Sequence, residues 1–332
     1  MYVNYFFIFY EIPVVFSLSI CYTPFIGFLC RTGGNMKKRK TLQDLTIKDN
    51  FLFGAVMSVE ENCKGFLEMV LGFSIAQVVV SKEKSIVYHP EYKGVRLDIY
   101  AEDENHTHYN VEMQVKKKTA LGKRSRYYHS QMVMEALASG EDYETLPDTF
   151  VIFVCDFDPF GEHLYCYTFG NECRENKNVK LDDGSCTIFL STRGENLEEV
   201  PAELVRFLKF VTADLEESEE DFQDELVKQF QETIHNIKAD REMGERYMIF
   251  EEMLREEKLE GRQEGRIEAT REGIFELLEN LGEMPDRLRN KMENLEELGD
   301  LKFLFKLAAK TDSMQSFTKD AENYLQTKEK HE

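Results

Sequence analysis

The chain has 332 residues, of which 42% are hydrophobic and 12% aromatic, so it can form one large domain or two smaller ones with a sizeable core. Its 41 basic and 62 acidic residues give a net charge of −21, which argues against a protein that coats nucleic acid by charge alone. The seven cysteines are scattered without a C-x-x-C pair, a pattern typical of reduced thiols in a cytoplasmic protein.

Residues 1–35 form an apolar stretch rich in Phe, Tyr and Ile. The stretch is long enough for a membrane anchor with Lys37–Lys40 on the cytoplasmic side, but no basic segment precedes it as in a signal peptide. The other interpretation is a mis-assigned translation start, because Met36 and the basic residues after it resemble a natural N-terminus. We expect the second interpretation, and therefore no membrane association.

The next segments alternate between helix and strand patterns. Apolar residues from Asp49 to Leu71 recur at a spacing of three to four, which predicts a helix with Asp49 as its N-cap. The short apolar pieces Val78–Val80 and Ile86–His89 are expected to be strands.

Two segments with alternating apolar and polar residues follow, Val95–Ile99 and Tyr109–Lys116. Period-two alternation is typical of half-buried strands, and the polar turn Glu102–His106 between them predicts a hairpin. Such a hairpin would place Asp98 and Glu112, one carboxylate from each strand, on the same polar face.

This acidic pair suggests a metal site. Two carboxylates suit a hard cation such as Mg2+ or Mn2+, and the carbonyl of Met113 could be a third oxygen ligand. A cation there would activate a water and polarise a phosphodiester. The alternative is that both acids are solvated on the hairpin surface. The apolar neighbours favour the metal, and so do the basic residues that follow without an acid among them: Lys116, Lys117, Lys118, Lys123, Arg124 and Arg126.

The remaining segments of this half complete the predicted fold. Tyr127–Ala138 has a helical pattern, and Gly140 is a natural stop. The continuous apolar run Thr149–Cys155 predicts a buried central strand, with further strands at His163–Phe169 and Cys186–Leu190. This order predicts the α/β class, with a mixed sheet flanked by helices.

From Leu197 onward the pattern is helical. Ala213–Glu225 holds eight acidic residues and no basic one, and a long charged helix is expected from Phe222 to about Glu260. A Glu-Gly-Arg repeat at Glu260–Arg266 then places Gly261 and Gly265 on one helix face. Each costs about 1 kcal/mol relative to Ala, so either close helix packing compensates or the segment is a solvated linker. Ile274–Tyr324 would close the chain as a small helical unit.

Five blocks in this order resemble the PD-(D/E)XK nuclease superfamily, and more specifically its branch of recombination-promoting nucleases and transposases. The blocks are Thr46–Phe53, the acidic motif from Asp98 to Gln114, Lys123–Tyr128, Ala138–Leu146 and Phe150–Phe160. The resemblance covers about residues 41 to 235. It implies a restriction-endonuclease-like core and metal-dependent hydrolysis of DNA, linked to recombination or mobile elements.

The resemblance also implies roles for single residues. Asp98 and Glu112 would bind the metal, and Gln114 stands where many superfamily members have a lysine that orients the water and stabilises developing charge. Glutamine is found at this place in the recombination-promoting branch. Lys116, two residues further on, would supply the missing charge or is an ordinary surface lysine. The residues expected to contact DNA are Lys116, Lys123, Arg124, Arg126 and Tyr127, the arginines at a helix start where backbone N–H groups also favour phosphate.

Four parts are therefore expected: the extension 1–35, a nuclease-like domain 36–212, an acidic and Glu-Gly-Arg helical linker 213–273, and a helical unit 274–332 whose helices could join two copies in a homo-oligomer. The competing function is a catalytically silent module that keeps the nuclease fold and binds DNA or a protein partner. The acidic pair favours the enzyme, whereas the missing lysine and the acidic surface favour the silent module.

Overall fold

The structure is a computed structural model that describes residues 40–82, 85–86, 95–96, 98–137, 140 and 142–329. The predicted extension 1–35, the proposed start at Met36 and most of the predicted strand Ile86–His89 lie outside these residues. Within them, no helix is long and apolar enough to cross a membrane.

A six-stranded mixed sheet is the centre of the fold. Its strands are β1 (Val78–Lys82), β4 (Ile99–Asp103), β5 (His108–Gln114), β6 (Thr149–Cys155), β8 (Ser185–Ser191) and β7 (Cys166–Phe169), in this spatial order. Strands β5, β6 and β8 are parallel to one another, whereas the outer pairings are antiparallel. The short strands β2 (Ser85–Ile86) and β3 (Val95–Arg96) pair separately.

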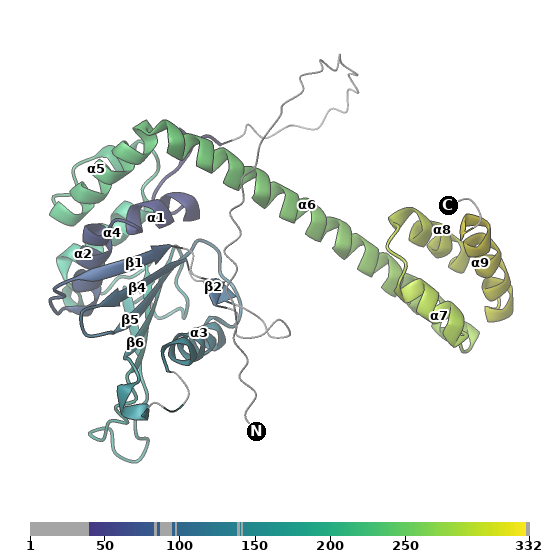
Figure 1. Cartoon of the computed structure of the whole chain (residues 1–332), viewed down its shortest axis with the longest axis horizontal. Helices are drawn as coiled ribbons and strands as arrows, with labels where there is room; N and C mark the ends of the chain where they lie inside the picture. The colour runs from purple at the N-terminus through teal and green to yellow at the C-terminus, as the bar shows by residue number, and fades with distance from the viewer. Residues whose placement is uncertain are drawn as a thin grey trace, which may run out of the picture. The chain divides into compact units, whose positions relative to one another are not determined.

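Helices cover both faces of this sheet (Figure 1). One face is covered by α1 (Asn50–Met57), α2 (Glu60–Leu71), α4 (Ala202–Thr212) and α5 (Glu225–Ala239). The other face is covered by α3 (Leu121–Ala136). Because parallel strands with helices on both faces are buried on both sides, β6 is apolar from Phe150 to Cys155. The mixed sheet flanked by helices confirms the predicted fold class.

Phenylalanines hold the layers together. On the face with four helices, Phe66 and Phe230 each contact Phe207 of α4, with ring centroids 5.3 and 5.8 Å apart. On the α3 face, Tyr128 stacks on Phe153 of β6, which stacks in turn on Phe189 of β8. Both clusters are buried, so each layer contributes apolar burial to the stability of the domain.

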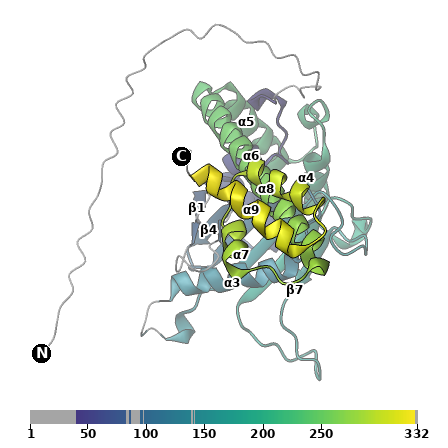
Figure 2. The ribbon, with the colours of Figure 1, turned by 90° about the vertical axis from the view of Figure 1, so that its right-hand side faces the viewer.

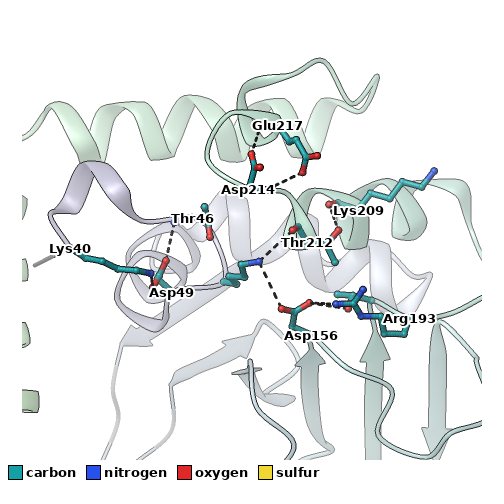
Figure 3. Close-up of polar contacts among 11 residues, drawn as sticks. Lys40, Thr46, Asp49, Asp156, Arg193, Lys209, Thr212, Asp214 and Glu217 are labelled. Carbon is teal, nitrogen blue, oxygen red and sulfur yellow. Dashed lines mark hydrogen bonds and ion pairs between the residues drawn. The ribbon is translucent and has the colours of Figure 1, made fainter. Parts of the chain in front are cut away.

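A polar cluster ties helix ends to strand ends on the face opposite α3. Asp156, which follows β6, contacts Arg193 after β8 at 3.6 Å and Lys48 before α1 at 3.9 Å (Figure 3). Lys48 also donates to the carbonyl oxygen of Thr212 at the end of α4, at 3.4 Å. Since Asp156 is largely buried, these two cations offset the cost of placing its charge there.

After α5 the described residues are mainly helical. Helix α6 spans Arg241–Leu278, and α7 (Asp286–Glu293), α8 (Leu298–Ala308) and α9 (Met314–Glu329) gather around its end (Figure 2). Together they form a separate apolar cluster that includes Ile274 and Phe317. Five short 3-10 helices lie at Leu42–Asp44, Tyr143–Thr145, Leu197–Glu199, Glu217–Glu219 and Glu279–Leu281.

Several predicted helices begin or break elsewhere than expected. The predicted helix Asp49–Leu71 is two helices, α1 and α2, and the helix predicted to begin at Tyr127 begins at Leu121. The helix predicted from Phe222 to Glu260 breaks at Asp240, whose carboxylate caps α6 by accepting from the amide of Glu242. Asp is a favoured N-cap, so a new helix begins there at little cost.

Candidate active site

Four polar side chains of β5 share the face that α3 covers, and the last three are near its first turns: His108, Asn110, Glu112 and Gln114. All of β5 is buried, and Glu112 is only 2% exposed. The alternation predicted a half-buried strand, with solvated acids as the alternative; for Glu112 that alternative is wrong, because α3 packs over this face. A carboxylate at this depth requires charged or hydrogen-bonding partners.

The charged partner of Glu112 is Arg124, in the first turn of α3. Its Nη2 lies 2.9 Å from Oε2 of Glu112, and its Nη1 donates to Oε1 of Gln114 at 3.3 Å. Its Nε also donates to the hydroxyl of Tyr128 at 3.2 Å, and the guanidinium carbon lies 5.3 Å from the centroid of that ring. Arg124 therefore joins the strand acid to the helix.

Weaker hydrogen bonds complete the surroundings of Glu112. The side-chain amides of Asn110 and Gln114 each donate to its carboxylate at 3.4 Å, and the hydroxyl of Tyr128 does so at 3.5 Å. Because these distances are long, the bonds are weak and the ion pair with Arg124 is the closest contact.

Asp98 interacts with Glu112 across the hairpin. Burial raises the pKa of Glu112 to about 7, and the negative charge of Asp98 adds to the rise. The charge of Arg124 and hydrogen bonds from the Asn110 side chain and the Asp98 backbone lower the same pKa. Since the ionised form of Glu112 is disfavoured, further positive charge at this place would stabilise it.

The alternation had predicted that Asp98 lies within a strand, but in the structure it lies outside the strands. It is partly exposed and immediately precedes β4, whose pairing with β5 begins at Ile99. Alternation of side chains shows which residues share a face, but it does not show where the ladder of backbone hydrogen bonds ends. Asp98 therefore lies at the open end of the β4–β5 hairpin, where it interacts with Glu112 of β5.

The oxygen atoms gathered here fit a hard divalent cation. Asp98 and Glu112 offer carboxylates and Gln114 an amide oxygen, the donors that Mg2+ and Mn2+ accept. In addition, Oδ1 of Asn110 is buried without a hydrogen-bond partner, which costs free energy unless a cation or water satisfies it. The described part of the chain contains no group of three or more His, Cys, Asp or Glu side chains arranged for a metal, and a cation here would rely on two acids and neutral oxygens.

The other predicted site residues divide between the interior and the surface. The side chain of Met113 is in the core on the opposite face, which leaves its backbone carbonyl as the group a cation could bind. Lys116 is exposed and lies beyond the end of β5 at Gln114. Lys123 and Arg126 are exposed on α3, and Tyr127 is partly exposed there and packs against the apolar cluster on the α3 face.

Sequence reasoning missed two features of this face. It gave Asn110 no role, although that residue shares the polar register of Glu112. It also assigned Arg124 to DNA alone, although the one-turn spacing of Arg124 and Tyr128 on a helix places both on one face. Beside this site, His129 of α3 lies between the hydroxyls of Thr149 and Thr187, at 2.7 and 3.0 Å.

Comparison with known protein families identifies a family for this chain. The model of a family described as PD-(D/E)XK nuclease family transposase matches residues 47–261. No curated protein and no solved structure matches the chain. The matched residues include the whole sheet, α3 and the acidic pair, and they are more than half of the chain. The chain therefore belongs to the PD-(D/E)XK nuclease family transposases.

Proposed function

We propose that this protein is a metal-dependent DNA endonuclease that uses Asp98 and Glu112 to bind Mg2+ or Mn2+. The observation that carries the proposal is the buried carboxylate of Glu112, which interacts with Asp98 and lies beside an unsatisfied amide oxygen. The family supports a nuclease, and its description as a transposase supports a role in recombination or mobile elements.

Each residue would contribute one part of the reaction. When bound, the cation would polarise the phosphodiester and lower the pKa of a water. Asp98 and Glu112 would hold it, with the carbonyl of Met113 as a possible further ligand. Gln114 would orient the attacking water through its amide, whose oxygen is also a possible ligand of the cation, and Arg124 would stabilise the negative charge that develops on the phosphate.

The surface around the site is suited to the DNA backbone. Lys116, Lys123 and Arg126 are exposed and carry charges that phosphates attract, and Tyr127 is exposed enough to stack on a base. This local positive charge would offset the net charge of −21, which otherwise repels DNA. We propose that the protein acts on DNA and that it does so in the cytoplasm.

Plasmid nicking in Mg2+, Mn2+ or EDTA tests this proposal. The variants are Asp98→Asn and Glu112→Gln, which keep the size of each side chain, and each should lower the rate by about 100-fold or more. The matched control is Glu102→Gln, on the same hairpin, because Glu102 contacts His106 at the far end of β4. This control should nick at the wild-type rate.

A catalytically silent DNA- or protein-binding module is the second candidate. The observation in its favour is that Arg124 already neutralises Glu112, while position 114 has glutamine instead of lysine. Folded wild-type protein that binds DNA but does not nick it in either metal would support this candidate and contradict the nuclease. Equal nicking by all three variants would place the activity elsewhere.

A further inference from the structure

Arg124 donates hydrogen bonds to oxygen atoms that a metal would also bind. Its two terminal nitrogens reach Oε2 of Glu112 and Oε1 of Gln114, so one guanidinium spans two of the candidate ligands. Nearby aromatic rings hold it in this position: the guanidinium carbon lies 5.3 Å from the centroid of Tyr128 and 6.0 Å from that of Phe153. The guanidinium is therefore built into the site rather than resting on the surface.

A divalent cation and this guanidinium oppose each other at Glu112. Oε2 accepts a hydrogen bond of 2.9 Å from Arg124, Oε1 accepts a long one from Asn110, and the Asp98 backbone also donates to this carboxylate. A cation on either oxygen would lie within one carboxylate group of the guanidinium, in a buried site where water screens charge poorly. Their repulsion, and the use of the Gln114 oxygen by Arg124, both weaken metal binding.

We propose that Arg124 is an exchangeable counter-ion, which holds Glu112 and Gln114 until a divalent cation takes them and then turns its donors to the phosphate of the DNA. The inference rests on the proposed metal site. Since 29% of the Arg124 side chain is exposed and α3 carries it at its first turn, its donors can reach a ligand outside the site. A guanidinium offers the paired donors that bind a phosphate in bidentate geometry.

This exchange couples metal to DNA. A cation at Glu112 releases Arg124 for phosphate, and a phosphate that binds Arg124 removes it from Glu112. Each ligand therefore strengthens the binding of the other by the same factor, as linkage requires. In the protein without a metal, Arg124 stabilises an otherwise uncompensated buried carboxylate.

Calorimetric titration of Mn2+ into the full chain tests the inference without using activity. Arg124→Met removes the competing charge and keeps a good helix former, so Mn2+ should bind about tenfold more tightly, or ~1.4 kcal/mol. Arg126→Met is the matched control, because it removes the same charge from the exposed side of the same helix. It should change the Mn2+ affinity by less than about twofold.

The outcomes separate this inference from the proposed function. Equal or weaker Mn2+ binding by Arg124→Met overturns the exchange, and so does equal tightening by Arg126→Met, which would indicate a general charge effect. Glu112→Gln should abolish Mn2+ binding. If it does not, the metal site of the proposed function fails as well. If Mn2+ binding is lost in Glu112→Gln but unchanged in Arg124→Met, the exchange is overturned and the proposed metal site is retained.

A measurement on the wild type covers the case in which Arg124→Met does not fold. In protein with 15N-labelled arginine, the Nε–H resonance of Arg124 can be assigned by its loss in Arg124→Lys. Addition of Mg2+ should move this resonance as the hydrogen bond to Tyr128 and the ion pair to Glu112 break. A resonance that stays in place at saturating Mg2+ overturns the exchange.

Discussion

His129 of α3 is a buried histidine whose charge would be costly. Its two ring nitrogens meet the hydroxyls of Thr149 and Thr187, and the Ser125 hydroxyl contacts Thr187 as well. Burial lowers the pKa of His129 to about 4, while the charge of Asp183 opposes this shift. The neutral ring therefore joins α3 to β6 and β8 at physiological pH, and it has no place in the proposed chemistry.

Acid should destabilise the fold through this histidine. An unfolded histidine has a pKa of about 6.5, so between pH 6.5 and 4 the unfolded chain binds the additional proton and stability falls as pH falls. The contribution is fully present above pH 6.5, and about 2 kcal/mol of it should be lost between pH 8 and 5. Urea unfolding at the two pH values, on wild type and His129→Gln, measures the difference. Because glutamine keeps both hydrogen-bonding functions and has no charge to gain, an equal loss of stability in this variant would contradict the assignment.

At the scale of elements, helix α3 determines the surroundings of Glu112, because it buries this carboxylate and supplies Arg124 as its partner. The sequence predicted this helix from Tyr127, where its apolar pattern begins, but it starts at Leu121 after Ala120 in a left-handed conformation with φ of 63°. The N-cap position is Ala120, which offers no capping side chain, so the usual signal for a helix start is missing there. The extra turns bring Arg124 over the strand. Strand β6, by contrast, was predicted with correct ends, because an apolar run between polar residues carries both its type and its limits.

The glycines of α6 give a test of how that helix is used. A Cβ added at Gly261 or Gly265 would meet no atom within 4 Å, whereas one at Gly273 would meet the Phe305 ring at 2.9 Å. If the Glu-Gly-Arg repeat is solvated, Gly261→Ala and Gly265→Ala should each stabilise the helix by up to about 1 kcal/mol. Gly273→Ala, on the same helix, should gain nothing or lose stability. Thermal unfolding of the three variants measures this.

The opposite result would have a specific meaning. If alanine at Gly261 or Gly265 lowers stability and reduces the mass found by sedimentation, the glycine face packs against a second copy of the chain. That outcome would support the homo-oligomer expected from the C-terminal helices and contradict the interpretation of this segment as a solvated linker.

At the scale of the whole molecule, the described residues form separate apolar cores. The cluster on the four-helix face of the sheet extends through α5 to Tyr247 of α6, and the C-terminal cluster begins with Ile267 of the same helix. The two clusters share no residue among those described. Sequence patterns predict a linker over residues 213–273, and within that range Val227 and Phe230 of α5 are fully buried in the cluster on the four-helix face.

We therefore expect two unfolding transitions in calorimetry of the full chain. Phe207 and Phe317 are both fully buried, one in each cluster, and replacing a buried phenylalanine by alanine costs about 3–5 kcal/mol. Phe317→Ala should lower only the transition of the C-terminal unit, by more than about 10 °C because that unit is small. Phe207→Ala should lower only the other transition. Since the proposed metal ligands all lie in the sheet domain, Phe317→Ala should bind Mn2+ as the wild type does below its first transition. A single transition that both variants lower would mean that α6 couples the two cores, and the helical unit would then be part of the nuclease fold rather than an attached one.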